Sequence, residues 1–284
     1  MRLTRCYIDT PLQIGALVSL PESISVHLTR VLRLGLGARL VLFNGDGYDY
    51  EAELASLGKR GAGAEVISMR QVASESPLRL VLAQAVARGE KMDFVLQKAT
   101  ELGAAGFVPL VTERTEVRLD AERGEKRRAH WQGVIASACE QSGRAQLPEL
   151  AAVATLTDWL APRTSAAEAT SASDSTIIDL RFPLFYLDPE AELSLCELPV
   201  DARTRACFVI GPEGGLGDRD LVHLRAADAT GLRLGPRVLR TETAGLALLA
   251  AMQAMYGDFQ GKIAQVAPSE VAQTIRPRAA NPPR

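Results

Sequence analysis

Two glycine-bearing segments near the C-terminal end combine backbone freedom with charge. The first, IGPEGGLGDRD, begins at Ile210, and the second, LGPRVLRTETA, begins at Leu234. Glycine lets backbone N–H groups approach a ligand without obstruction by a Cβ atom. In the second segment Arg237 and Arg240 stand directly before an apolar helix, whose N-terminal end carries a partial positive charge. Together the segments predict a ligand site, although either glycine-rich turn alone could be purely structural.

The first segment differs from the common phosphate-binding loops. It lacks the Gly-Lys-Ser/Thr ending of a P-loop, and its third glycine is out of register with the GxGxxG dinucleotide fingerprint. Glu213, an acid inside the loop, also disfavours a polyphosphate. The cysteines Cys6, Cys139, Cys196 and Cys207 show no CxxC spacing, and no metal-ligand cluster is evident, so we expect no metal.

The segments that must position these loops alternate between strand and helix patterns. Strands are predicted at 78–86, 106–111, 183–187, 206–210 and 231–234, and helices at 90–102, 120–141, 218–227 and from 243 onward. This alternation predicts an α/β domain with a mostly parallel sheet. Ligands bind such sheets beyond the carboxyl ends of the strands. Because both glycine-bearing loops follow predicted strands, both can line one edge of the sheet.

The first 73 residues predict a smaller, β-rich domain. The turn-rich NGDG, Asn44 to Gly47, lies between two strand patterns and predicts a hairpin. A short helix is expected to end at Gly35 or Gly37, and a further strand at 64–68. The second domain is then expected over 74–260, with a flexible insertion at 164–176 and a disordered tail at 261–284.

Composition limits the classes of protein. The chain has 284 residues, 47% of them hydrophobic, and a formal net charge of −2, so it is globular and global charge does not indicate a nucleic-acid partner. No run of about 18 apolar residues is present, and MRLTRCYIDT lacks the pattern of a signal peptide. We therefore expect a cytoplasmic protein without membrane contact. Arg30, Arg33 and Arg39 form a local cationic group, for which an ordinary solvated surface is the alternative.

Six motifs occur in a distinctive order along the chain. They are HLTRVLRLGLG, RGEKMDFVLQKATELG, PLVTERTEVRL, ACEQSGR, IGPEGGL and LGPRVLRTETA. In this order they resemble the SPOUT methyltransferases, specifically the RsmE family of bacterial 16S rRNA uridine-N3 methyltransferases. The departures, the Ser/Ala-rich insertion and the long tail, fall on no motif.

The resemblance implies a fold, a cofactor and partners. It implies a PUA-like β-barrel that binds RNA, then a SPOUT-type α/β domain whose C-terminal part forms a trefoil knot and binds S-adenosylmethionine (SAM). It also implies a homodimer that acts on 16S rRNA or the small ribosomal subunit. The matching motifs place the following residues around SAM: Leu187, Pro189, Ile210, Gly211, Pro212, Glu213, Gly214, Leu234, Gly235, Val238, Leu239 and Thr243, the last opening the final helix.

The implied reaction moves a methyl group from a sulfonium to uracil N3, which must lose its proton. Arg240 is the first candidate, and Arg237 the second, for stabilising the negative charge that develops on the uracil. The proton acceptor stays open between Glu213 and Glu242, because each could instead be a loop anchor or a helix-dipole partner. His130 and His223 fit packing or surface positions better than a base.

Several assignments leave alternatives. For RNA contact the motifs indicate Arg5, His27, Arg30 and Arg33. Lys91, Glu101, Arg114 and Arg144 also fall on motifs, where structural or dimer roles compete with catalysis. The small face of the last helix, Ala244, Ala247 and Ala251 with Leu248 and Met252, favours a dimer contact, although burial within one chain explains it equally. Methylation of another RNA such as tRNA, or a non-catalytic RNA-binding assembly factor, are the rival functions.

Overall fold

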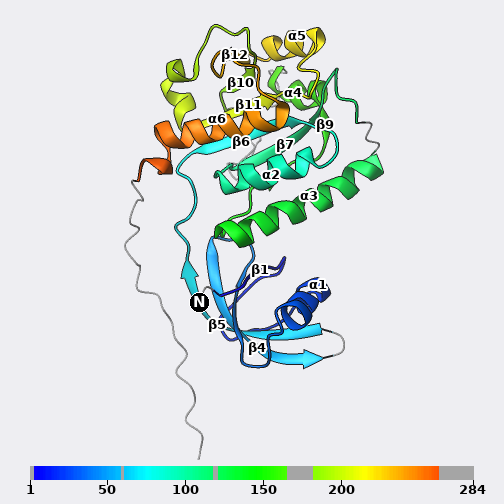
Figure 1. Ribbon diagram of the computed structural model, residues 1–284, viewed down its shortest axis with the longest axis vertical. Helices are drawn as coiled ribbons and strands as arrows, with labels where there is room; N and C mark the ends of the chain where they lie inside the picture. The colour runs from blue at the N-terminus through cyan, green and yellow to red at the C-terminus, as the bar shows by residue number, and fades with distance from the viewer. Residues whose placement is uncertain (1–2, 59–60, 118–120, 165–181, 262–284) are drawn as a thin grey trace, which may run out of the picture. The chain divides into compact units, whose positions relative to one another are not determined.

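The computed structural model describes residues 3–58, 61–117, 121–164 and 182–261 (Figure 1). It divides into two compact units. The first holds the described residues up to Glu75 together with Cys139–Gln146, and the second holds Ser76–Ala138 and the described residues from Leu147 on. The expected insertion at 164–176 and the expected tail at 261–284 lie outside the described residues, apart from their first residues, Thr164 and Gly261.

The first unit is built on a five-stranded sheet in the order β1-β3-β4-β5-β2. The strands are β1 (Arg5–Tyr7), β2 (Leu17–Ser19), β3 (Arg39–Phe43), β4 (Tyr48–Gly58) and β5 (Gly61–Gln71). β1 is parallel to β3 and the other neighbours are antiparallel. Alternate residues such as Leu40, Leu42 and Leu54 are buried in one apolar cluster, because successive side chains of a strand point to opposite faces. The predicted hairpin at Asn44–Gly47 joins β3 to β4 and is confirmed.

The short helix of this unit is present but ends early. α1 (Glu22–Val26) continues into a π-helical turn, η1 (His27–Val31). Arg33 then adopts a left-handed conformation with φ 54°, which stops a helix. The predicted end at Gly35 or Gly37 is therefore wrong, since a non-glycine residue takes the left-handed position.

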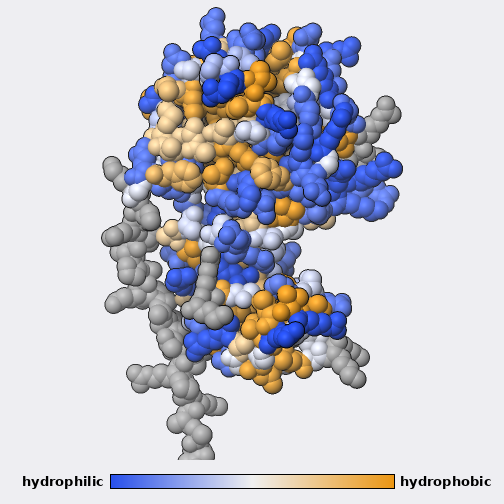
Figure 2. Space-filling view, in the orientation of Figure 1, coloured by the Kyte–Doolittle hydropathy of each residue, from blue (hydrophilic) through white to orange (hydrophobic). Residues whose placement is uncertain are grey.

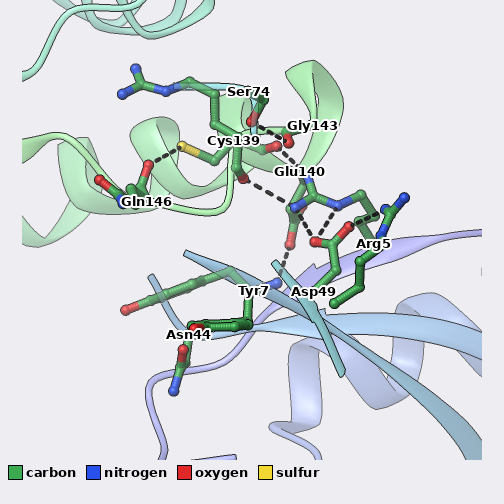
Figure 3. A network of polar contacts seen from close by, with 12 residues as sticks. Arg5, Tyr7, Asn44, Asp49, Ser74, Cys139, Glu140, Gly143 and Gln146 are labelled. Atoms are coloured by element: carbon green, nitrogen blue, oxygen red, sulfur yellow. Dashed lines mark hydrogen bonds and ion pairs between the residues drawn. The ribbon is translucent and has the colours of Figure 1, made fainter. Parts of the chain in front are cut away.

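Arg5 holds residues 139–146 against the sheet of the first unit (Figure 3). Its guanidinium donates to Asp49 Oδ1 at 2.6 and 3.2 Å, to the Cys139 carbonyl at 2.8 Å and to the Arg144 carbonyl at 3.1 Å. Its side chain is only 6% exposed. Glu140 adds a second link by accepting from the Tyr7 N–H at 2.9 Å. Internal partners occupy this buried guanidinium, so the structure does not favour RNA contact by Arg5, which stays a prediction.

The second unit contains a parallel sheet of the order β12-β10-β11-β6-β7-β8, with β9 also paired to β7. The strands are β6 (Arg79–Ala85), β7 (Gly106–Val111), β8 (Glu149–Leu150), β9 (Ala154–Thr155), β10 (Leu184–Leu187), β11 (Arg205–Ile210) and β12 (Thr230–Leu232). Every neighbouring pair is parallel. The predicted parallel α/β architecture is confirmed, whereas the trefoil knot stays a prediction.

Helices cover both faces of this sheet (Figure 1). α2 (Lys91–Glu101) packs beside α6 (Thr241–Tyr256) on one face, and α4 (Leu156–Thr164) packs beside α5 (Asp218–Ala226) on the other. The longest helix, α3, covers Ala121–Ser142. Burial on both faces explains the nearly continuous apolar runs of the strands. The strands β8 and β9 were not predicted, because two-residue strands leave no periodic signal, and the nine-residue helix α4 was not predicted either.

The apolar face of α6 is used inside the chain. Leu248, Leu249 and Met252 are fully buried. Gly245 lies so close to the sheet that an added Cβ would meet Leu82 Cδ1 at 3.3 Å. The small residues therefore allow close packing of α6 on its own sheet, which is the alternative to the dimer contact.

α6 begins two residues earlier than predicted, and its first residue joins the helix to the end of β11. Arg240 is the extended N-cap residue, and its carbonyl accepts from the N–H groups of Thr243 and Ala244. Thr241 Oγ1 accepts from Gln84 Nε2 at 2.9 Å and donates to the Gly211 carbonyl at 2.6 Å. The prediction that Thr243 opens this helix is wrong, because the helix begins at Thr241 with Arg240 as its N-cap residue.

Replacement of Arg5 should destabilise the first unit strongly. Arg5→Met leaves a buried carboxylate and two carbonyls without this partner, which costs about 3–5 kcal/mol. Arg70→Met is the matched control, because Arg70 binds the other oxygen of Asp49 but is 78% exposed, and its loss should cost at most about 1 kcal/mol. Amide hydrogen exchange in β4 and β5 measures both changes. Equal effects of the two variants would contradict the structural role of Arg5.

Loss of the Thr241 hydroxyl should destabilise the second unit. Thr241→Val preserves the shape of the side chain but removes the donor to the Gly211 carbonyl and one of the two acceptors of Gln84 Nε2, the other being the Ala85 carbonyl, at a cost of about 1–3 kcal/mol. Thr243→Val, an exposed change in the same turn, should stay within about 0.5 kcal/mol. Urea unfolding followed through Trp131 and Trp159, both in the second unit, compares the two. Equal urea midpoints for the two variants would contradict the proposed contribution of the Thr241 hydroxyl to stability.

Candidate functional site

Three loops meet at one edge of the parallel sheet. β12, β10 and β11 are neighbours, so the residues that follow Leu187, Ile210 and Leu232 leave the sheet at the same side. Together with Lys91 and the first turn of α6, these loops enclose a cavity of ≈ 520 Å³. Small-molecule sites typically occupy about 300–1,000 Å³. The edge predicted from the two glycine-bearing segments is thus the edge that holds the cavity.

Most residues predicted around the cofactor line this cavity. They are Leu187, Pro189, Ile210, Gly211, Pro212, Glu213, Leu234, Gly235, Val238 and Leu239, together with the two arginines Arg237 and Arg240. Gly214 and Thr243 do not belong to the lining. The Gly214 carbonyl instead accepts from Arg114 Nη1 at 2.9 Å, and Thr243 is exposed on the outer side of its helical turn. Arg114, whose role the motifs left open, therefore anchors the loop after β11.

The glycines of the first loop are required by the turn itself. The Gly215 N–H donates to the Pro212 carbonyl at 2.9 Å, and Gly215 has a φ of +72°. A Cβ on Gly211 would lie 2.9 Å from the Leu216 nitrogen. The loop can therefore fold back on itself only with glycine at position 211. This steric requirement of the turn holds even without a ligand that must approach the backbone.

Lys91 stands between two carboxylates at the cavity. Its Nζ lies 3.1 Å from Glu213 Oε1 and 3.5 Å from Glu242 Oε2. The hydrogen bond with Glu213, with the charges of Glu213 and Glu242, raises the pKa of Lys91 above its usual value. Lys91 therefore stays protonated and serves as a fixed cation, a role that the motif alone left open.

Glu213 is an anchored carboxylate. Its Oε1 accepts from the Arg88 N–H at 3.2 Å as well as from Lys91. Partial desolvation alone would raise the pKa of this carboxyl. Its hydrogen bonds to backbone N–H groups and to Lys91 outweigh that effect and hold the pKa below its usual value. Glu213 thus ties the loop after β11 to the start of α2.

The two candidate arginines are exposed at the cavity. The Arg240 side chain is 84% exposed, and its Nη1 lies 4.0 Å from Glu242 Oε1. Arg237 is also exposed and lines the same cavity. Both side chains can therefore reach a substrate at the opening. His130 and His223 are exposed and lie outside the lining, and His130 pairs with Asp93 at 2.6 Å.

Sequence reasoning missed several lining residues. These are Leu216, Leu221, Leu232, Thr241 and Ala244. Asp188 and Gly215 also line the cavity, and both lie in motifs that the resemblance places around the cofactor, YLDP (186–189) and IGPEGG (210–215). Leu221 comes from α5, and only the tertiary packing of that helix brings it to the cavity.

Two kinds of feature are absent from the described residues. No group of three or more His, Cys, Asp or Glu side chains is placed to hold a metal ion there. No helix in that part of the chain is long and apolar enough to cross a membrane.

The lining suits a ligand with apolar, polar and cationic parts. Ile210, Leu216 and Leu232 provide apolar walls, and the glycine-bearing loops bring backbone groups to the cavity. Asp188 and Glu242 add carboxylates that can face positive charge. An adenosyl ligand that carries a sulfonium and an amino acid fits this donor set.

Comparison with known proteins agrees with the site. Residues 74–253 match the family model of an RNA methyltransferase domain, and residues 20–67 match that of an RNA methyltransferase PUA domain. "Ribosomal RNA small subunit methyltransferase E" of Buchnera aphidicola is 29% identical over 257 residues, covering 90% of this chain and 98% of the relative. The protein of that name from Mycobacterium tuberculosis is 30% identical over 246 residues, covering 87% of this chain and 89% of the relative.

A solved structure gives the same result. The crystal structure of a ribosomal RNA small subunit methyltransferase E from Neisseria gonorrhoeae, bound to S-adenosyl methionine, is 34% identical with a TM-score of 0.76. The match covers 91% of this chain and 100% of that one. The predicted order of a PUA domain followed by a methyltransferase domain is confirmed. The chain belongs to the ribosomal RNA small subunit methyltransferase E family of RNA methyltransferases.

Proposed function

We propose that this protein uses S-adenosylmethionine to methylate N3 of a specific uridine in the 16S rRNA of the small ribosomal subunit. The observation that carries the proposal is the cavity at the β10, β11 and β12 edge, lined by the IGPEGG and LGPRVL loops. The Neisseria gonorrhoeae relative, similar over 91% of this chain, was crystallised with the same cofactor. The position on uracil is taken from the resemblance to the RsmE family.

The chain's own residues would divide the work at this site. Backbone groups of Gly211, Gly235 and Val238 and the apolar side chains of Ile210 and Leu239 would hold the cofactor. When bound, S-adenosylmethionine supplies an electrophilic methyl group on a sulfonium sulfur. Arg240, at the mouth of the cavity, would hydrogen-bond a uracil carbonyl and stabilise negative charge as the N3 proton leaves. Arg237 is the second candidate for that role.

The first unit would contact the RNA through the exposed cations near η1. His27, Arg30 and Arg33 are all exposed there. Figure 2 shows hydrophilic and hydrophobic side chains side by side over α1, and Val31 and Leu36 are large apolar residues exposed in this region. Cations beside apolar side chains can pair with phosphates and pack on bases. Arg5 is left out of this proposed set because it is buried.

Two further parts of the proposal rest on the family. We infer a cytoplasmic homodimer, as the resemblance implies. The helix face first assigned to the dimer no longer supports it, since Leu248 and Met252 are buried within the chain.

Purified enzyme should methylate small ribosomal subunits or 16S rRNA in the presence of a metal chelator. Nuclease digestion and mass spectrometry should then find N3-methyluridine at one position, and sedimentation of the same sample should give twice the 30.5 kDa chain mass. Calorimetric titration of the same protein with SAM should show saturable binding. Methylation of tRNA instead, or binding of RNA without any methyl transfer, would contradict the proposal.

Arg240→Ala should slow the chemical step far more than it weakens SAM binding. Removal of one donor to a developing anion typically lowers the rate about 10²–10³-fold. Single-turnover methylation with saturating RNA measures this step, with Arg237→Ala as the matched variant from the same loop. An unchanged rate at saturation, with a smaller salt dependence of RNA binding, would make Arg240 a phosphate contact.

A further inference from the structure

We propose that Glu242 accepts the N3 proton of the target uracil, an inference that rests on the proposed function. The described cavity is lined by only six side chains that carry charge: Lys91, Asp188, Glu213, Arg237, Arg240 and Glu242. Lysine and arginine side chains are hydrogen-bond donors without an acceptor. The choice therefore lies among three carboxylates.

Two of these carboxylates already accept hydrogen bonds that stabilise the fold. Asp188 Oδ1 accepts from the Glu190 N–H at 2.9 Å and closes the turn after β10. Glu213 Oε1 accepts from the Arg88 N–H and from Lys91. Protonation of either group would neutralise the carboxylate and weaken the bonds that hold the turn or the loop anchor.

Glu242 keeps an open acceptor. Within the described part of the chain, Glu242 Oε2 is buried and has no hydrogen-bond partner, its nearest charge being Lys91 Nζ at 3.5 Å. Buried polar atoms are normally hydrogen-bonded, so an open carboxylate oxygen on a cavity wall indicates a partner in the ligand. An N–H donor such as uracil N3–H satisfies this requirement, and Asp or Glu is a common general base.

The neighbouring charges suit the transfer. Lys91 from α2, Glu213 from the loop after β11 and Arg240 from the N-cap of α6 are the charged groups near Glu242. Lys91 Nζ lies 3.5 Å from Glu242 Oε2, and Glu242 stands in the first turn of α6, where the positive end of the helix dipole favours a carboxylate. Arg240 precedes Glu242 by two residues, so one helical turn would present both an acceptor for the proton and a donor for a uracil oxygen.

The step balances without a further reactant. The proton on N3 moves to the Glu242 carboxylate, and the electron pair of the N–H bond stays on the uracil. That electron pair forms the N3–methyl bond while the methyl–sulfur bond breaks, and the latter pair remains on sulfur as a neutral thioether. Glu242, whose side chain is 17% exposed, then returns the proton to water.

The test uses Glu242→Gln, with Glu213→Gln as the matched control, because both remove a carboxylate partner of Lys91. Single-turnover rates with saturating RNA and SAM are measured from about pH 6 to about pH 9. Glu242→Gln should be slower by about 10²–10⁴-fold near neutral pH, and its rate should rise about tenfold per pH unit as the uracil ionises unaided. Glu213→Gln should bind SAM less tightly but keep the shallower pH dependence of the unchanged enzyme.

Two readouts separate a base from a structural carboxylate. A target uracil with fluorine at C5 has a more acidic N3–H, and it should restore the Glu242→Gln rate much more than the Arg240→Ala rate. SAM binding by calorimetry should change less than about threefold in Glu242→Gln, which also shows that the variant folds. If Glu242→Gln keeps the pH profile of the unchanged enzyme, or if its defect is lost SAM binding, the assignment is overturned. If the unchanged enzyme forms no N3-methyluridine, the proposed function itself fails.

Discussion

The Thr241 hydroxyl is the contact on which the geometry of the site depends. It accepts from the Gln84 amide on β6 and donates to the Gly211 carbonyl at the end of β11. Arg240 and Glu242 flank Thr241 in sequence, so the same contact sets the position of both groups relative to the first glycine-bearing loop. The buried Thr241 side chain thus joins the central strand β6, the first glycine-bearing loop and the helix α6.

The charges around the cavity show a division of roles. Lys91 pairs with both Glu213 and Glu242, but only Glu213 is further held by a backbone N–H. One carboxylate therefore stabilises the loop, while the other keeps a free oxygen. Arg240 remains largely solvent-exposed and available to a substrate. Such an arrangement fixes the loop after β11 and leaves the Arg240 side chain in solvent.

The sequence predicts the second unit well for a physical reason. Strands buried on both faces are apolar along their whole length, and α2 shows a clear apolar stripe of Met92, Val95, Leu96 and Ala99, all of which are buried. The loops at the sheet edge follow from the rule that parallel strands place their carboxyl ends together. The cavity could thus be located before any side chain was placed.

Local sequence patterns mislead where contacts between residues far apart in the sequence determine the structure. Arg5 sits in a cationic pattern, but its partners Asp49 and Cys139 lie 44 and 134 residues away. Thr241 and Thr243 look alike as helix caps, and the bonds of Thr241 to Gln84 and Gly211, 157 and 30 residues away, distinguish them. Residues 139–146 likewise belong with the first unit through contacts that no local pattern reveals.

Amide hydrogen exchange with and without SAM tests the central claim most directly. If the two loops and the first turn of α6 form one cofactor site joined by Thr241, SAM should protect residues 210–215, 234–240 and 241–244 together. Thr241→Val should weaken that protection in all three segments at once. Protection confined to one loop, or none at this sheet edge, would contradict the account.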